Sequence, residues 1–474
     1  MAGLFVAAVV IGAGAAVYYA MAGLTLSHYD ARAHLVVARR IADSLTPGWQ
    51  QIGAVWLPLP HLVNLPLVQW DWAYRTGFVS TGVCVLVLSA GLAALGGTLF
   101  RWTQSWPAAL AAPAVVLLNP NLLYLQSTPM TEPLLIGLSL LALRAVSNWT
   151  EADGRASAAP AGLLLAALAL TRYEGWLVAG ALFALGALGK RRLGPVEACR
   201  PGLYVAAAVG AFLLLSKGAT GVWFVSSGFF EPDPLSLHQI GPTLERVWHG
   251  TRELGGLAVV VVGLAGAVLA LRDLARGRMA RALSLALLAA AVLPLYAFYS
   301  GHPFRIRYMV PVVVSLGALS GLVVAALPRR VHVAAAVMLV LTVSWLRPPL
   351  DSRAAMVMEA QWETPFRLGR RDVTRYLSTE WDGTPILASM GSLAHYMQES
   401  SHAGFRIAHF VHEGNGDLWQ AARHAPARHV NWMLIEENAE GGDELAARAR
   451  TDPLFLSGLT RVAEGGGVAL YRRR

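Results

Sequence analysis

Long apolar runs recur along this 474-residue chain, and they constrain its fold more than any other feature. They lie near residues 4–26, 78–100, 107–125, 131–147, 160–189, 201–224, 253–271, 280–300, 307–327 and 331–347. About twenty apolar residues cross the hydrocarbon core of a bilayer as one helix. Only 14% of the residues are charged, against roughly 25% in soluble domains. The sequence therefore predicts a polytopic α-helical membrane protein.

The run at 160–189 is too long for one ordinary span and holds the segment TRYEGW in its middle. Read as two short helices, it turns at the membrane surface there. The distribution of basic residues distinguishes one span from two, because cytoplasmic loops carry an excess of lysine and arginine. Two short helices place the basic loops at 190–200, 272–281 and 329–330 together in the cytoplasm, with the N-terminus inside. We therefore expect about eleven spans in the cytoplasmic (inner) membrane.

This topology places most polar residues of chemical interest on the extracytoplasmic side. Residues 1–347 form the predicted transmembrane domain and residues 348–474 a small extracytoplasmic α/β domain. In the latter, strand-like runs (TPILASM, HVNWMLIEE, VALYRR) alternate with helical ones (GSLAHYMQ, DLWQAARHA, DELAARARTD). The net charge of +9 is partly the topology signal and requires no nucleic-acid partner.

The histidines of the C-terminal domain invite a metal-binding interpretation. Their spacing matches no ligand pattern, so we expect surface histidines at His395, His402, His409, His412 and His424. The two cysteines, Cys84 in an apolar run and Cys199 in a basic loop, form no disulfide framework.

A carboxylate and an imidazole follow the first apolar run, in the stretch LTLSHYDARAHLVVARRIADSL. At 100° per residue, Asp30 and His34 share the apolar face of a helix, with Arg32 and Arg39 nearly opposite. This pattern predicts an amphipathic helix on the outer membrane surface. The alternative is a shortened capping box in which Ser27 is the N-cap. A carboxylate on the apolar face favours a functional site, since perturbed carboxylates cluster at such sites.

Further ionisable residues lie where spans meet the outer surface, and ionisable groups at membrane depth mark functional cavities. Each also has a structural alternative. Glu132 is favoured at a helix start by the helix dipole alone, and Arg172 has Glu174 as a partner. Arg305 and Arg307 can reach lipid headgroups, as arginines at the ends of spans often do. His61 is more easily explained as a packed ring. The candidates are Glu132 at the start of a span, Arg172, Tyr173 and Glu174 in TRYEGW, His302, Arg305 and Arg307 in GHPFRIR, and His61 in a proline-rich loop.

Asp30 in the first outer loop, the segment WLPLPHL and Glu132 opening the fourth span resemble the protein O-mannosyltransferase and aminoarabinose transferase superfamily. These proteins are membrane glycosyltransferases of the GT-C fold, and the resemblance covers roughly the first 350 residues. It implies a polyprenyl-phosphate-linked sugar as donor, membrane lipids as partners, and a protein, lipid or glycan as acceptor. Asp30 matches the catalytic acid position and Glu132 the second acidic position. YDARAH has one acid where many mannosyltransferases have an adjacent pair, and the chain has no MIR-type domain, so sugar and acceptor stay open.

The residues also suit this chemistry independently of the family resemblance. Attack on a lipid-phosphate sugar needs a base for the incoming hydroxyl, here Asp30, and cations for the departing phosphate. Arginine pairs with phosphate bidentately, which favours Arg172 with Arg305 or Arg307. His34, His61, Tyr173, Glu174 and His302 are further candidates for the substrate cavity. A single displacement inverts the anomeric carbon.

The sequence leaves open whether a metal ion is required and whether the protein is an enzyme, a transporter or a scaffold. A divalent metal ion between Asp30 and Glu132 is compatible with the sequence, whose spacing does not require one. A transporter or flippase for a lipid-linked substrate is the competing class, and inverted repeats with charges at the bilayer midplane would mark it. A non-catalytic scaffold that presents the C-terminal domain is the third.

Overall fold

The computed structural model describes residues 1–474 except residues 54, 153–156, 192–193, 225–231 and 440. The chain forms two compact units. Unit 1 comprises residues 1–23, 81–212 and 233–359, and unit 2 comprises residues 24–80, 213–232 and 360–474. The predicted division at residue 347 stays a prediction. Each unit is described below by itself.

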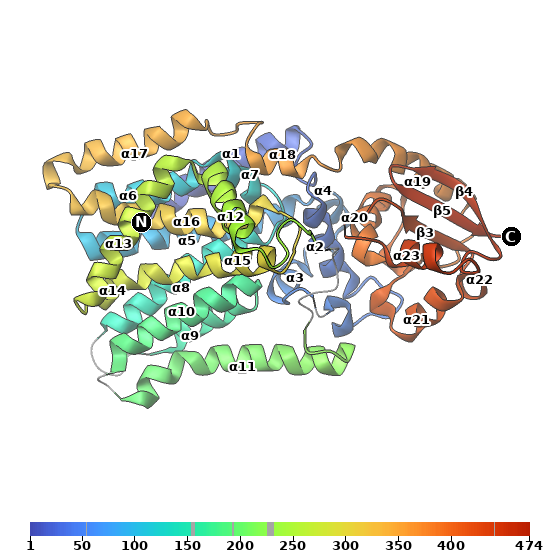
Figure 1. The fold of residues 1–474 in the computed structure, drawn as a ribbon, viewed down its shortest axis with the longest axis horizontal. Helices are drawn as coiled ribbons and strands as arrows, with labels where there is room; N and C mark the ends of the chain where they lie inside the picture. Colours follow the sequence, from blue (N-terminus) through green and yellow to red (C-terminus); the bar gives the residue numbers. More distant parts are fainter. Residues whose placement is uncertain (54, 153–156, 192–193, 225–231, 440) are drawn as a thin grey trace. The chain divides into compact units, whose positions relative to one another are not determined.

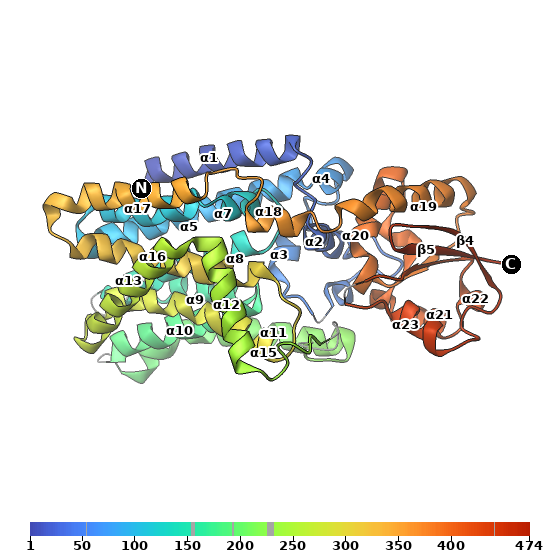
Figure 2. The ribbon, with the colours of Figure 1, turned by 45° about the horizontal axis from the view of Figure 1, so that its top comes forward.

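Unit 1 is a helical bundle (Figure 1). Three groups of its helices pack side by side: α8 with α9 and α10, α13 with α16, and α6 with α16 and α17 (Figures 1 and 2). The helices are α1 (Ala2–Met21), α5 (Phe78–Thr103), α6 (Trp106–Leu117), α7 (Pro120–Gln126), α8 (Glu132–Glu151), α9 (Ala159–Ala169), α10 (Tyr173–Lys190), α11 (Pro195–Thr220, which ends in unit 2), α12 (Ile240–Gly255), α13 (Leu257–Ala275), α14 (Met279–Ala282), α15 (Val292–Tyr299), α16 (Val310–Ala326), α17 (His332–Leu346) and α18 (Ala355–Ala360).

Seven helices of the described residues are long and apolar enough to cross a membrane, or up to eight if the bent pair α6–α7 is one span. The span count of eleven is thus not confirmed, although helices form most of each predicted apolar run. The run at 160–189 divides as expected into α9 and α10, which are separated at residues 170–172. In the span Ile306–Ala326, which contains α16, 83% of the most apolar stretch is buried, against 17% in α11. Such an apolar and little-buried helix is suited to face lipid.

Glycines allow the bundle helices to approach closely. A Cβ atom on Gly91 of α5 would lie 2.7 Å from the Cα atom of Gly137 in α8. A Cβ atom on Gly266 of α13 would lie 2.2 Å from the carbonyl oxygen of Leu319 in α16. Neither distance leaves room for a methyl group, so only glycine permits these backbone contacts. Small residues at helix contacts are typical of membrane bundles, where close packing replaces the hydrophobic effect.

Unit 2 is built on a five-stranded mixed sheet with the order β2-β1-β3-β5-β4. β1 pairs in parallel with β2 and β3, while β5 is antiparallel to β3 and β4. β3 is buried along its whole length, as expected for a strand covered on both faces. The strands are β1 (Ile386–Ala388), β2 (Phe410–Val411), β3 (Trp432–Glu436), β4 (Leu459–Gly465) and β5 (Val468–Arg473).

Helices cover both faces of this sheet and form two apolar cores. The α/β character predicted for the C-terminal segment is confirmed: α20, α21 and α23 lie at the predicted helical runs. The helices of unit 2 are α2 (Tyr29–Arg40), α3 (Leu59–Asn64), α4 (Asp71–Thr76), α19 (Arg367–Glu380), α20 (Met390–Ser400), α21 (Asp417–His424), α22 (Pro426–His429) and α23 (Glu444–Thr451).

Helix α2 belongs to this fold and does not present a solvated arginine face. Leu35 and Val36 of α2 share one core with Trp432 of β3. Arg32 and Arg39, expected on the polar face, are 1% and 9% exposed. The amphipathic interpretation is wrong on this point. A helical wheel does not reveal the partners of these arginines: Arg32 pairs with the distant Glu399, and Arg39 pairs with Asp43 and Asp71.

Candidate functional site

A buried ionic group of four side chains joins three helix starts of unit 1. Its members, here called the ionic cluster, are Glu132, Arg172, Glu174 and Arg307. Arg172 Nη1 lies 3.0 Å from Glu132 Oε1 and donates to Thr131 Oγ1 at 2.8 Å. Arg172 Nη2 donates to Glu174 Oε1 at 2.9 Å. One guanidinium group therefore connects two carboxylates from different helices.

Arg307 supplies the second cation of the ionic cluster. Its Nη1 lies 3.9 Å from Glu132 Oε1, and its guanidinium carbon lies 5.6 Å from the centre of the Tyr308 ring. The four side chains are 1–15% exposed. Two guanidinium groups balance two carboxylates, so the group is neutral overall. This balance makes burial of four charges tolerable.

Helix geometry positions the cluster. Glu132 is the first residue of α8, and Glu174 lies in the first turn of α10. The helix dipole stabilises a carboxylate at both positions. Arg172 precedes α10 in an extended conformation, with φ −154° and ψ 160°. The structural alternative for Arg172, pairing with Glu174, is thus realised, and Glu132 pairs with it as well.

The GHPFRIR turn carries a second polar group beside the cluster. His302 Nδ1 lies 2.8 Å from the Pro303 carbonyl oxygen, so Nδ1–H donates there. Nε2 is then the acceptor for the hydroxyl of Tyr308 at 3.1 Å. The Ile306 N–H donates to Glu359 Oε2 at 2.9 Å, which ties the turn to α18. Arg305 is half-buried and precedes this anchored N–H.

The same helices enclose a small apolar pocket. Its lining includes Leu135 and Ser139 of α8, Val178 of α10, and Pro311 and Ser315 of α16. These positions lie about one to two turns beyond the starts of the three helices that carry the cluster. Tyr173, the first residue of α10, instead packs edge-on against Trp176 with ring centres 5.5 Å apart. The charged residues thus sit at one end of an apolar helical bundle.

Asp30 belongs to unit 2, at the second position of α2, and its side chain is half-buried. The N-cap of α2 is His28 rather than Ser27: His28 Nδ1 accepts the Asp30 N–H at 3.1 Å. The alternative of a shortened capping box with Ser27 as N-cap is therefore not realised. An ionised carboxylate in a first helical turn is favoured by the helix dipole.

The helix that carries Asp30 is held firmly. The Tyr29 hydroxyl donates to the Gly391 carbonyl oxygen at 2.8 Å, and Arg32 forms an ion pair with Glu399. Arg32 and Arg370 hold the pKa of Glu399 down at about 2, against the desolvation that alone would raise it. Arg39 donates to Asp43 at 3.0 Å and to Asp71 at 2.6 Å. A group on such a helix has a fixed position within unit 2.

His34 and His61, two further candidates, contact each other. His34 Nδ1 lies 3.2 Å from His61 Nε2, and Trp56 stacks on His61. His61 Nδ1 lies 3.1 Å from the Leu57 carbonyl oxygen and therefore donates to it, which leaves Nε2 as the acceptor for His34. Burial lowers the pKa of His61 to about 3. Packing, the favoured interpretation of His61, agrees with this geometry.

Sequence reasoning missed two contributors to these sites. Thr131 contacts Arg172 and Glu359 anchors the GHPFRIR turn, and no local motif marks either residue. The expectation of surface histidines fails for His395 and His412, which are 1% and 0% exposed. His402 and His424 are exposed as expected, and His409 is half-buried. Long-range packing, which leaves no spacing signal, decides these cases.

The long apolar helices and the small mixed sheet define a class, a polytopic membrane protein of the GT-C fold, and solved structures bear this out. The crystal structure of the aminoarabinose transferase ArnT from Cupriavidus metallidurans bound to undecaprenyl phosphate matches with a TM-score of 0.58 at 13% identity, over 98% of this chain and 97% of that chain. ArnT in the apo state matches with a TM-score of 0.58 at 16% identity over the same shares. No protein-family model and no curated protein matches the sequence.

Proposed function

We propose that this protein is an inverting membrane glycosyltransferase that moves a sugar from a polyprenyl-phosphate donor to an acceptor hydroxyl on the extracytoplasmic side of the inner membrane. The observation that carries the proposal is the buried ionic cluster at the helix starts of a GT-C fold. The related fold of ArnT binds undecaprenyl phosphate, which supports a lipid-phosphate donor here.

In this proposal Arg172 and Arg307 bind the donor phosphate. Two guanidinium groups beside one carboxylate, Glu132, offer several N–H donors within a low-dielectric region. Charge-assisted hydrogen bonds to phosphate are stronger there than in water. A phosphate group would share these N–H groups with Glu132 and Glu174. The two carboxylates would therefore hold the guanidinium groups in place before the lipid-linked sugar binds. Of the arginines in GHPFRIR, Arg307 is favoured because it lies beside Glu132.

Asp30 is the proposed general base. It lies on a helix held in place by the hydrogen bond of Tyr29 and the ion pair of Arg32, which supplies the positioning that general-base catalysis needs. Its carboxylate would take the proton from the acceptor hydroxyl as that oxygen attacks the anomeric carbon. The sugar–phosphate bond breaks in the same displacement, which inverts the anomeric carbon and leaves the polyprenyl phosphate in the membrane.

The phosphate part of the proposal can be tested without knowing the sugar. The probe is undecaprenyl phosphate added to purified protein in lipid nanodiscs, with undecaprenol as the matched lipid that lacks the phosphate. We expect binding of undecaprenyl phosphate to weaken by about ten- to a hundred-fold in Arg172→Gln, since a charge-assisted contact contributes about 1.5–3 kcal/mol. Undecaprenol binding should not change.

The control variant is Arg281→Gln. Arg281 also belongs to unit 1 and lies 3.7 Å from a carboxylate, Asp273, but in a loop predicted to be cytoplasmic. Equal losses in both variants would contradict the placement of the phosphate. Transfer is then tested with membranes that contain polyprenyl-phosphate sugars labelled in the sugar. Movement of the lipid across the bilayer without transfer would favour the flippase instead.

A further inference from the structure

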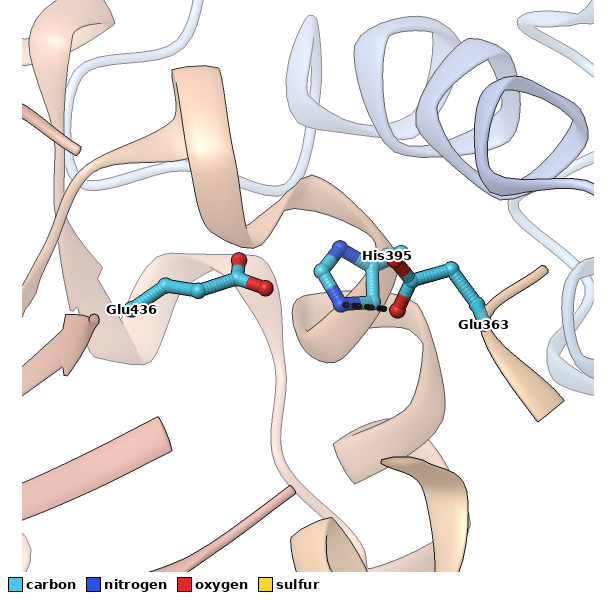
Figure 3. A group of neighbouring side chains, drawn as sticks. All are labelled: Glu363, His395 and Glu436. Carbon is cyan, nitrogen blue, oxygen red and sulfur yellow. Dashed lines mark ion pairs between the residues drawn. The ribbon is translucent and has the colours of Figure 1, made fainter. Parts of the chain in front are cut away.

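Unit 2 contains a compact group of three side chains that the proposed transferase chemistry does not use. Glu363, His395 and Glu436 each present one ligand atom, and these atoms lie within 4.8 Å of one another. Figure 3 shows the carboxylates of Glu436 and Glu363 approaching the His395 ring from opposite sides. His395 Nε2 lies 3.9 Å from Glu363 Oε2. His395 is 1% exposed and Glu436 is 7% exposed.

The topology of the sheet explains why these residues meet. Glu436 is the last residue of β3, and His395 lies on α20, which follows the parallel neighbour β1. The chain leaves β1 for β2 on one side and returns to β3 on the other. Ligands of open α/β sheets bind outside the carboxyl ends of strands at such a switch point. The group therefore occupies the part of the sheet that is suited to a ligand.

Three polar atoms of the group make no hydrogen bond to the described residues. Among the described residues, neither ring nitrogen of His395 nor Oε2 of Glu436 makes a hydrogen bond of good geometry. Buried polar atoms in native structures nearly always have a partner, and an exception calls for an explanation such as an ion or a water molecule. Here three such atoms lie in one place.

The charges around the group favour an added cation. Arg370 Nη1 donates to Glu363 Oε2 at 2.8 Å, and its Nε and Nη2 donate to Glu399. Among the described residues no arginine donates a hydrogen bond to Glu436, whose Oε2 is buried. An imidazole binds a metal through a ring nitrogen, and both ring nitrogens of His395 are buried within this group.

We propose that Glu363, His395 and Glu436 form a binding site for one divalent transition metal, and that Zn²⁺ is the ion that fits it. One imidazole and two carboxylates supply three protein ligands, and a water molecule completes a tetrahedral site. Softer ions that select thiolates find no sulfur ligand here. The two carboxylates balance the charge of the ion.

The required adjustment is small. Tetrahedral zinc with bonds of about 2.0–2.1 Å separates its ligand atoms by about 3.3 Å. The ligand atoms now lie within 4.8 Å of one another, close to the separation that the ion requires. Arg370 acts as a positioning residue because its hydrogen bond fixes the Glu363 carboxylate. The ion would then link the segment before α19, helix α20 and strand β3.

The test is metal binding by the full-length chain, purified without a histidine tag and stripped with a chelator. After dialysis against a small excess of ZnSO₄ and removal of unbound ion, elemental analysis should find about one zinc per chain. The variants His395→Gln and Glu436→Gln should lose it. The control His412→Gln removes another fully buried histidine of unit 2, which lies outside the group, and should keep it.

A spectroscopic arm keeps the test valid if a variant does not fold. Wild-type protein loaded with Co²⁺ should show the intense visible absorption of a four-coordinate nitrogen and oxygen site, and Zn²⁺ should displace it. The midpoint of thermal unfolding should rise with Zn²⁺, because an ion that binds only the folded state stabilises it. Failure of the wild type to retain zinc, or equal retention in Glu436→Gln, overturns the proposal. Neither result bears on undecaprenyl phosphate binding, so the transferase proposal is tested separately.

Discussion

Replacing Glu174 separates a phosphate-binding role of Arg172 from a purely structural one. Arg172 donates to both Glu174 oxygens, at 2.9–3.3 Å. In Glu174→Gln the amide oxygen still accepts a hydrogen bond, but the negative charge is gone. Arg172 keeps its ion pair with Glu132 at 3.0 Å, so the guanidinium stays in place. A bound phosphate would then meet one competing carboxylate instead of two.

The magnitude follows from Coulomb's law. Two unit charges about 5 Å apart interact by about 3 kcal/mol at an effective dielectric constant of 20. Relaxation of the site reduces this figure, so we expect a gain of about 1.5–3 kcal/mol. Undecaprenyl phosphate should therefore bind about ten- to a hundred-fold more tightly to Glu174→Gln than to the wild type. Most substitutions at a buried cluster weaken binding, so an increase is an unusual and specific outcome.

The two substitutions, Arg172→Gln and Glu174→Gln, should differ in their effect on the stability of the fold as well as on phosphate affinity. Arg172→Gln leaves two buried carboxylates without their shared cation, and breaking such a pair costs about 3–5 kcal/mol. Glu174→Gln leaves a cation that is still paired with Glu132, so the cost is smaller. Thermal unfolding in nanodiscs ranks the two variants. This separates folding from binding.

The assay is equilibrium binding of undecaprenyl phosphate and undecaprenol to wild type, Glu174→Gln and Arg172→Gln, monitored by tryptophan fluorescence. The reasoning is refuted if Glu174→Gln binds undecaprenyl phosphate no more tightly than the wild type while remaining folded. Arg172 would then serve only to join α8 and α10. An equal gain for undecaprenol would show that the substitution altered lipid packing and not the phosphate contact.

Three further predictions concern catalysis, topology and pH. Asp30→Asn keeps the shape of the side chain but cannot accept a proton, so transfer of labelled sugar should fall by roughly 10² or more. Binding of undecaprenyl phosphate should stay unchanged. Transfer at the wild-type rate would exclude Asp30 as the base. An impermeant maleimide should label exposed Cys199 only after the cells are opened, whereas buried Cys84 resists in both states; labelling of Cys199 in intact cells would reverse the topology. Burial lowers the pKa of His412 to about 3, so between pH 6.5 and about 3 this residue binds a proton in the unfolded chain and not in the folded one. Its own contribution to the free energy of unfolding therefore falls by about 1.4 kcal/mol per pH unit as the pH falls. His412→Gln should flatten the dependence of the unfolding midpoint on pH in this window, and an unchanged slope would contradict the assignment.

The sequence by itself determined the features that depend on local composition. Apolar length alone predicts helices in a bilayer, because a spanning backbone must satisfy its own hydrogen bonds. The break at Arg172 between α9 and α10 follows from polar residues inside an overlong run, and the structure has it there. The strands and helices of the C-terminal segment are likewise visible as changes of hydrophobic period.

The partners of charged residues were decided only by the tertiary structure. Arg32 looked solvated on a helical wheel, yet Glu399, far along the chain, neutralises it. Arg305 and Arg307 are two residues apart and equivalent in sequence, and the fold places Arg307 beside Glu132. His395 matched no ligand spacing because Glu363 and Glu436 reach it from separate elements. Local patterns record which residues avoid water, whereas charge pairing depends on contacts between segments that no local period encodes.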